Sequence, residues 1–161
     1  MRDEDFERLY DEHAQALYGF LAYRTGDPVL AEDLLADTFE KALRARRRFD
    51  RRRGSEKTWL YSIALNALRD QLRRRSAAER ATEQLAIRTP GEVAAVEESL
   101  GRRDELAQAL ARLSEEEREV VALRYGADLT VPEIARLKKE KLTTIEGRVY
   151  RALRKLREQL D

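Results

Sequence analysis

The sequence contains no cysteine and a single histidine, His13. Disulfide bonds and thiolate catalysis are therefore excluded, and the chain lacks the Cys and paired His ligands on which zinc sites are built. A metal enzyme would have to rely on carboxylates alone. Adjacent carboxylates such as Glu32 and Asp33 fall on a predicted exposed face without an apolar pocket to separate their pKa values. We therefore expect a protein that is not an enzyme, with no catalytic residue, no metal and no cofactor.

Long apolar runs are also missing. No segment approaches the roughly 20 consecutive apolar residues that span a bilayer, and the first five residues are mostly acidic, without the apolar stretch of a signal peptide. We expect a cytoplasmic protein with no membrane insertion. Its 161 residues suffice for one ordinary domain or two small helical ones.

Charge is abundant but nearly balanced, since 32 Lys and Arg face 31 Asp and Glu. The net charge of +1 therefore says little about partners, whereas the distribution says more. Basic residues crowd into 44–53, 69–75 and 136–157, and acidic residues dominate the first dozen positions, 32–40 and 92–105. Such segregation favours a polyanion on some surfaces and a basic protein on others.

The first forty-five or so residues predict two amphipathic helices. Apolar residues recur at helical spacing from Phe6 to Leu21, and Gly26-Asp27-Pro28 should end the first helix and cap the second. The outer face of the second helix is acidic. It carries Glu32, Asp33, Asp37 and Glu40.

A third helix is predicted after the arginine-rich run. Gly54 breaks the pattern, and Ser55 or Thr58 can cap the new helix. Two apolar flanks, one of which includes Trp59 as a core residue, enclose a narrow polar stripe. The stripe consists of Ser62, Asn66, Arg69 and Arg73. We expect the core to position this helix and leave the stripe exposed for a ligand.

The composition changes between residue 76 and about residue 102. Bulky apolar residues become sparse, and Thr89-Pro90-Gly91 forces a turn. We interpret this stretch as an inter-domain linker, partly helical or disordered. The predicted fold class is all-α, with two small helical domains, 1–75 and 103–161, joined by the linker 76–102.

The last third predicts a helix-turn-helix. Three capping boxes, Ser114-x-x-Glu117, Thr130-x-x-Glu133 and Thr143-x-x-Glu146, mark helix starts. The last two frame a short helix, a brief turn and a longer helix. We expect Arg148, Arg151 and Lys155 on the outer face of the longer helix, as in DNA-binding modules of this type.

At these residues the chain resembles a known family, the extracytoplasmic-function sigma factors of RNA polymerase. The segments AEDLLADTF (31–39), TWLYSIA (58–64) and NALRDQLRRR (66–75) resemble conserved region two of that family. LSEEEREVV (113–121) and LTVPEIA (129–135) resemble region four. Both regions in this order, at this total length, identify the family more specifically than either motif alone.

The resemblance implies partners and site residues. The acidic face (Glu32, Asp33, Asp37, Glu40) would bind the clamp coiled coil of the polymerase β′ subunit. The C-terminal domain would hold the flap of the β subunit, and an anti-sigma factor would sequester the chain. The melted minus-ten element would be captured by Arg51, Arg52, Arg53, Ser62, Asn66, Arg69 and Arg73. The minus-thirty-five element would be bound by Thr143, Thr144, Glu146, Arg148, Arg151 and Lys155.

The chain departs from the family pattern around the turn of the helix-turn-helix. Lys138-Lys139 stands where the family often has Leu-Gly, so a left-handed turn residue must be avoided or strained. Ile145-Glu146-Gly147-Arg148 replaces the usual Val-Lys-Ser-Arg, so a positive charge near DNA has become negative. Either the Glu146 carboxylate folds back into its capping box, or it reads a cytosine amino group.

Two other interpretations of the sequence remain open at this point. The chain could be a helix-turn-helix transcription regulator that does not bind polymerase, with a first domain that senses a ligand or dimerises. It could also be a protein-interaction adaptor. The regulator does not account for the arginine loop and the polar stripe, which suit unstacked single strands better than duplex DNA. The adaptor would make the basic surfaces incidental.

Overall fold

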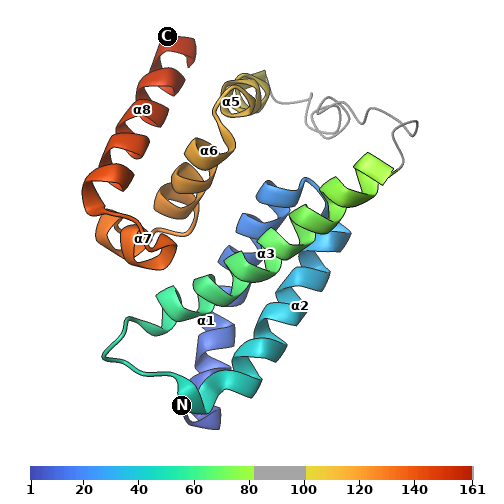
Figure 1. Ribbon diagram of the computed structural model, residues 1–161, viewed down its shortest axis with the longest axis vertical. Helices are drawn as coiled ribbons and strands as arrows, with labels where there is room; N and C mark the ends of the chain where they lie inside the picture. Colours follow the sequence, from blue (N-terminus) through green and yellow to red (C-terminus); the bar gives the residue numbers. More distant parts are fainter. Residues whose placement is uncertain (82–100, 161) are drawn as a thin grey trace.

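The computed structural model describes residues 1–81 and 101–160, and within them it contains helices and connecting turns but no strand (Figure 1). The all-α prediction is confirmed. Most of the predicted linker, including the Thr89-Pro90-Gly91 turn, lies outside the described residues.

The N-terminal domain is a three-helix bundle of α1 (Asp3–Thr25), α2 (Pro28–Ala45) and α3 (Glu56–Ala81), with a 3-10 turn at Arg46–Arg48. The predicted break between α1 and α2 is confirmed. Gly26 is left-handed with φ 67° and donates its N–H to the Ala22 carbonyl, while the Asp27 carboxylate accepts from the N–H groups of Val29 and Leu30.

The third helix begins where Ser55 caps it. The Ser55 hydroxyl oxygen accepts from the Thr58 N–H at 3.1 Å, so the cap is the first of the two predicted candidates. α3 continues to Ala81, six residues past the expected end of the first domain at residue 75. The bundle core is formed by buried leucines and aromatic side chains, among them Leu9, Leu17, Phe20, Leu21, Leu60, Tyr61, Leu65 and Leu68.

The C-terminal domain contains α5 (Gly101–Ala111), α6 (Glu115–Val121), one π-helical turn η2 (Ala122–Gly126), α7 (Val131–Lys138) and α8 (Leu142–Leu160). Two of the three predicted capping boxes are confirmed. Ser114 with Glu117 and Thr130 with Glu133 each exchange both reciprocal hydrogen bonds.

The third capping box was predicted wrongly. α8 begins at Leu142, so Thr143 is already the second residue of the helix. The carbonyl of Lys141 accepts from the N–H groups of Thr144 and Ile145, both at 3.1 Å, which makes Lys141 the residue before the first turn. Glu146 is therefore free of the capping role and is exposed on the helix.

The turn between α7 and α8 is strained at Lys139, which adopts φ 56° and ψ 42° where the family often has glycine. Glu140 donates its N–H to the Ala135 carbonyl at 3.0 Å, closing the left-handed helix end that this conformation requires. The sequence left open whether the conformation is avoided or strained. Lys139 adopts the left-handed conformation, in a connection of only three residues between α7 and α8.

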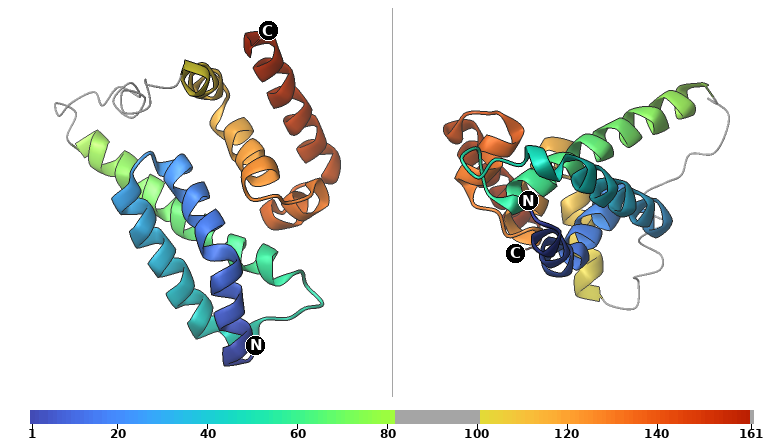
Figure 2. Two further views of the ribbon diagram at one scale, coloured as in Figure 1. Left: turned by 180° about the vertical axis from the view of Figure 1, so that it is seen from behind. Right: turned by 90° about the horizontal axis from the view of Figure 1, so that it is seen from below.

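The two domains touch each other in this structure, since α7 packs on α3 and η2 packs on α1. A single cluster of buried apolar side chains extends through both domains and includes Leu65 of α3 and Ile134 of α7. Figure 2 shows from behind that α6 and α7 lie between the N-terminal bundle and α8. No helix among the described residues is long and apolar enough to cross a membrane.

Candidate nucleic-acid and protein interfaces

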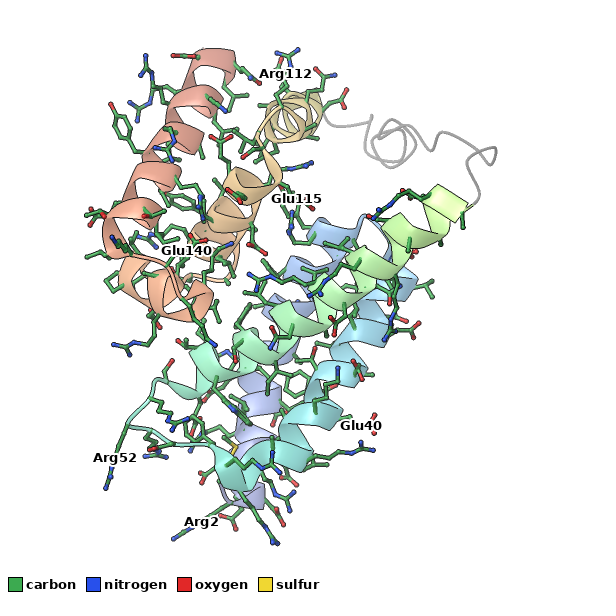
Figure 3. The ribbon with its side chains drawn as sticks, in the orientation of Figure 1. Arg2, Glu40, Arg52, Arg112, Glu115 and Glu140 are labelled. Atoms are coloured by element: carbon green, nitrogen blue, oxygen red, sulfur yellow. The ribbon has the colours of Figure 1, made fainter. Side chains whose placement is uncertain are left out.

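The acidic face of α2 points to solvent as predicted. Glu32, Asp33 and Glu40 are exposed and Asp37 is half-buried; Glu40 is labelled at the outer edge of the bundle in Figure 3. Asp37 pairs with Lys41 at 3.0 Å, and Glu40 pairs with Arg44 at 2.6 Å. Within the described residues neither Glu32 nor Asp33 forms an ion pair, so they provide the uncompensated negative charge of this face.

The arginine loop before α3 is shaped by its own backbone. Asp50 accepts from the Arg52 N–H through Oδ1 at 2.9 Å and from the Arg53 N–H through its carbonyl at 3.0 Å. Phe49 anchors the start of the loop against Trp59, with ring centroids 5.2 Å apart. Arg51, Arg52 and Arg53 are therefore held in an exposed turn, from which Arg52 projects away from the bundle (Figure 3).

Trp59 is only partly buried: it packs against the core cluster, and its ring also contacts Phe49 at the start of the loop. The prediction that it is a core residue therefore holds in part. Its position at the base of the loop couples the loop geometry to the packing of α3.

The polar stripe of α3 runs from the loop along the helix. Ser62 donates its hydroxyl to the Trp59 carbonyl at 2.6 Å, and Asn66 is exposed. Arg73 is exposed and lies 3.5 Å from Asp70. Arg69 is 42% exposed in its side chain and lies 3.9 Å from Glu119 of the C-terminal domain. Asn66 and Arg73 of the stripe are thus exposed, whereas Arg69 is already engaged by the C-terminal domain.

An open cleft of about 520 Å³ lies where the arginine loop meets α7. Arg51, Arg52 and Lys57 line it from the N-terminal domain, and Arg136 lines it from the C-terminal domain. Among the described residues that line it, the only carboxylate is that of Glu56, which pairs with Arg8 and Arg51. The cleft is therefore strongly cationic, as a groove that follows a nucleic-acid backbone is.

α8, the longer helix of the predicted helix-turn-helix, exposes most, but not all, of its predicted DNA-binding residues. Thr143, Thr144, Glu146 and Arg151 are exposed. Lys155 is also exposed, but its Nζ donates to Glu117 Oε1 at 2.8 Å. This contact ties α8 to the capping box of α6.

The placement of Arg148 on the outer face was wrong. Arg148 is buried, and its guanidinium donates to Glu140 Oε2 at 2.7 Å and lies 3.6 Å from Glu116 Oε2. At about 100° per residue it falls about 60° from Ile145, at the edge of the core stripe and not opposite to it. It therefore holds α8 against α6 and the preceding turn.

Sequence reasoning missed Tyr150. Its side chain is 68% exposed, one position from Arg151, on the face that points away from the core. Gly147 lies one turn earlier, and the Nη1 atom of Arg151 lies 3.2 Å from where a Cβ at Gly147 would be. The sequence contained a signal for this exposed position. Tyr150 follows Thr143 by seven residues and lies off the apolar stripe of α8, which consists of Ile145, Val149, Ala152 and Leu156.

The two domains match two family models. A model described as Sigma-70 region 2 matches residues 9–78, and one described as Sigma-70, region 4 matches residues 103–156.

Curated relatives match along nearly the whole chain. RNA polymerase sigma factor CarQ of Myxococcus xanthus is 34% identical over 156 residues, covering 96% of this chain and 88% of CarQ. ECF RNA polymerase sigma factor SigX of Bacillus subtilis is 31% identical over 175 residues, covering 98% and 88%. ECF RNA polymerase sigma factor BldN of Streptomyces coelicolor is 34% identical, and this chain spans 58% of its length.

Solved structures of similar fold are complexes. The sigma factor RpoE bound to the anti-sigma factor NepR from Bartonella quintana has a TM-score of 0.79 at 26% identity, covering 98% of this chain and 97% of that chain. CnrH in complex with the cytosolic domain of CnrY has a TM-score of 0.71 at 28% identity, covering 99% and 90%.

Proposed function

Since this chain belongs to the sigma-70 family, in its extracytoplasmic-function group, we propose that it binds core RNA polymerase and directs promoter recognition, melting and initiation. Sigma factors are transcription initiation factors. The observation that carries the proposal is the succession of region 2 and region 4 in one chain, each on its own helical domain. The alternative of a helix-turn-helix regulator that does not bind polymerase gives no role to the region 2 match.

Each of the two domains has its own proposed binding roles. The acidic face of α2 docks on the β′ clamp coiled coil, where Glu32 and Asp33 supply charge that no basic neighbour on the helix neutralises. The arginine loop and the polar stripe hold the melted minus-ten strand, because exposed arginines and a cationic cleft suit a single-stranded backbone. The C-terminal domain binds the β flap.

For the upstream element we propose a revised set of contacts on α8. Thr143, Thr144, Glu146 and Arg151 remain, and exposed Tyr150 joins them. Arg148 leaves the set because it is buried in ion pairs within the domain. Lys155 contributes only if its contact with Glu117 opens.

We also propose an anti-sigma partner, and work in the cytoplasm, where core polymerase is found. Support for the partner comes from similarity to RpoE and CnrH, whose structures contain NepR and the cytosolic domain of CnrY.

Reconstitution with core polymerase tests the function. The chain should co-purify with core enzyme and support promoter-dependent transcription. The double substitution Asp33→Lys and Asp37→Lys should leave the helix content unchanged, since both side chains point away from the core, and should lower core binding at least tenfold by placing like charges at the interface.

A matched control introduces the same change of charge on α1 instead of α2. Glu7→Lys with Asp11→Lys alters two exposed residues of α1 by the same amount and should leave core binding within twofold of the parent. If the α2 variant competes for core polymerase as well as the parent does, the docking surface lies elsewhere.

A further inference from the structure

The cleft between the arginine loop and α7 has the size of a ligand site. Its volume of about 520 Å³ lies within the range of about 300–1,000 Å³ that small-molecule sites occupy. The loop and the start of α3 line it with Arg51, Arg52 and Lys57, and α7 contributes Arg136 from the C-terminal domain. Figure 1 shows the loop beside α7 before the chain enters α3. A molecule in this cleft would therefore contact both domains at once.

The positive charge of the cleft exceeds what the protein itself neutralises. Of the carboxylates of the described residues, that of Glu56 alone lines the cleft, and it is shared between two arginines. Its oxygens lie 3.7 Å from Arg8 Nη2 and 3.6 Å from Arg51 Nη2. Lys57 Nζ donates to the backbone carbonyl of Asp128 at 3.3 Å rather than to a carboxylate.

Two of the cations in the cleft are left for an external anion. Across the part of the chain that the structure describes, neither Arg52 nor Arg136 forms an ion pair, and both side chains are exposed. A single exposed arginine is ordinary on a protein surface. These two, however, reach one cleft from different domains, and Arg52 does so from a loop that projects beyond the bundle (Figure 3). A cleft lined by one sign of charge focuses the electric field and concentrates counter-ions.

Contacts next to the cleft fix its two sides relative to each other. Thr58 Oγ1, in the first turn of α3, donates to Glu133 Oε2 at 3.3 Å, and Glu133 precedes Arg136 by three residues in α7. The Cδ atom of Arg136 lies 4.0 Å from where a Cβ at Gly54 would be, so the arginine stem runs along the backbone of the loop. The cleft is thus formed before a ligand binds, which lowers the entropic cost of binding.

The arrangement of these cations matches an anion with several phosphates. An arginine fork binds two phosphate oxygens at once, and a lysine ammonium acts as a point charge. One phosphate has few oxygens to share among four cations, whereas a di- or triphosphate spreads several charges and many acceptor oxygens along a short chain. A nucleic-acid strand has one charge per nucleotide and brings less charge into a cleft of this size.

We propose that this cleft binds the phosphate chain of a free nucleoside di- or triphosphate, held by Arg52 and Lys57 of the N-terminal domain and by Arg136 of the C-terminal domain. The proposal goes beyond the proposed function, because a free nucleotide needs neither polymerase nor promoter. It also affects that function. A bound phosphate chain occupies arginines on which the proposed minus-ten strand would lie, so nucleotide and single strand compete for the free chain.

Calorimetric titration of the free chain at constant ionic strength tests the site. ATP and sodium tripolyphosphate should bind with similar affinity, because the phosphates rather than the base make the contacts. Both should bind about tenfold or more tightly than AMP or orthophosphate, since a longer phosphate chain reaches more cations. Both should also raise the melting temperature with increasing concentration, as ligands of the native state do. Equal affinity for all four anions would mean non-specific attraction and would overturn the proposal.

A double variant removes one cation from each side of the cleft. Arg52→Gln with Arg136→Gln should weaken tripolyphosphate binding about 25-fold, the product of about fivefold for each exposed charged contact. The matched control is Arg2→Gln with Arg157→Gln, which also removes one exposed arginine from each domain. It should stay within about twofold of the parent, because distant surface charges are screened. Equal losses in the two variants would show that only net charge matters. Melting curves without ligand show whether both variants are folded.

Arg136 separates a free polyphosphate from a nucleic-acid strand. Arg136→Gln alone should weaken tripolyphosphate binding about fivefold. Binding of oligothymidylate of about 15 nucleotides, measured by fluorescence anisotropy, should change no more than it does with Arg157→Gln. In the parent, tripolyphosphate should displace the oligonucleotide.

The outcomes distinguish this proposal from the function. Equal losses of both ligands in Arg136→Gln would make the cleft a part of the strand groove and overturn a separate site. Failure of tripolyphosphate to displace the oligonucleotide would overturn the shared use of the loop arginines. If the chain fails to bind core polymerase, the proposed function fails, whereas titration of the free chain still reports the polyphosphate site.

Discussion

At the scale of single residues, Lys139 carries the clearest local strain. Its left-handed φ of 56° costs an L-residue with a Cβ about 1–2 kcal/mol, whereas glycine adopts it freely. We expect Lys139→Gly to raise the free energy of unfolding by about 0.5–1 kcal/mol, once the larger unfolded-state entropy of glycine is included. Thermal or urea denaturation measures this.

The control for that prediction has the opposite sign. Arg136→Gly places glycine at an exposed, right-handed position within α7 and should destabilise the chain by about 1 kcal/mol. A loss of stability in both variants would show that the backbone at residue 139 is relaxed in solution.

Glu117 is a second residue whose environment gives a measurable effect. Burial raises the pKa of its carboxyl, but hydrogen bonds from Lys155 and Ser114 outweigh this and leave the pKa below its ordinary value of 4.5. A carboxyl whose pKa is lowered by folding stabilises the native state above the unfolded pKa, and this contribution is lost as the pH falls through the folded pKa.

We therefore expect Glu117→Gln to lower the melting temperature by several degrees at pH 7, with a loss of about 2 kcal/mol. The difference from the parent should shrink as the pH falls below about 4.5. Melting curves at pH 7, 5 and 3.5 measure it, with Glu105→Gln as an exposed control. A constant difference across this range would contradict the assignment.

At the scale of elements, the start of α8 decides the role of Glu146. Because α8 begins at Leu142, no capping box restrains this carboxylate, and it lies exposed near the proposed DNA contacts. We expect Glu146→Lys to change stability by less than about 0.5 kcal/mol, as surface substitutions do. Duplex affinity should rise severalfold, with a salt slope steeper by about one unit.

Two further comparisons complete that test. Glu158→Lys makes the same charge change at the far end of α8 and should alter duplex binding less. Binding to a promoter that the factor transcribes and to its scrambled duplex tells repulsion from base reading: loss of discrimination would assign Glu146 to a cytosine amino group. No change in affinity or salt slope would place Glu146 away from the DNA.

At the scale of the whole molecule, the boundary between the domains combines a shared apolar cluster, to which Leu65 and Ile134 belong, with ion pairs at 3.6 and 3.9 Å. Raising NaCl from about 0.1 to 1 M shortens the Debye length from about 10 to 3 Å. We expect small-angle X-ray scattering to show a radius of gyration near 15 Å at low salt and a larger one at high salt. A constant radius would mean that apolar packing alone holds the domains.

Local sequence signals determined most of the secondary structure. Gly26-Asp27-Pro28, Ser55 and two of the three capping boxes act within four residues, so their outcome depends little on the rest of the chain. The acidic face of α2 and the exposed arginine loop follow in the same way from spacing and from the low cost of keeping charges in water.

Tertiary structure decided what spacing alone could not. Arg148 was placed outward because arginine is usually solvated, yet Glu140 and Glu116 converge on it from other elements and stabilise it in a buried position. Thr143 has no capping role because α8 already begins at Leu142, with the Lys141 carbonyl accepting from Thr144 and Ile145. Arg69 contacts Glu119, 50 positions along the chain, and Thr58 contacts Glu133, 75 positions along the chain. Such contacts depend on how two finished domains fit together, and no periodicity within either domain encodes that fit.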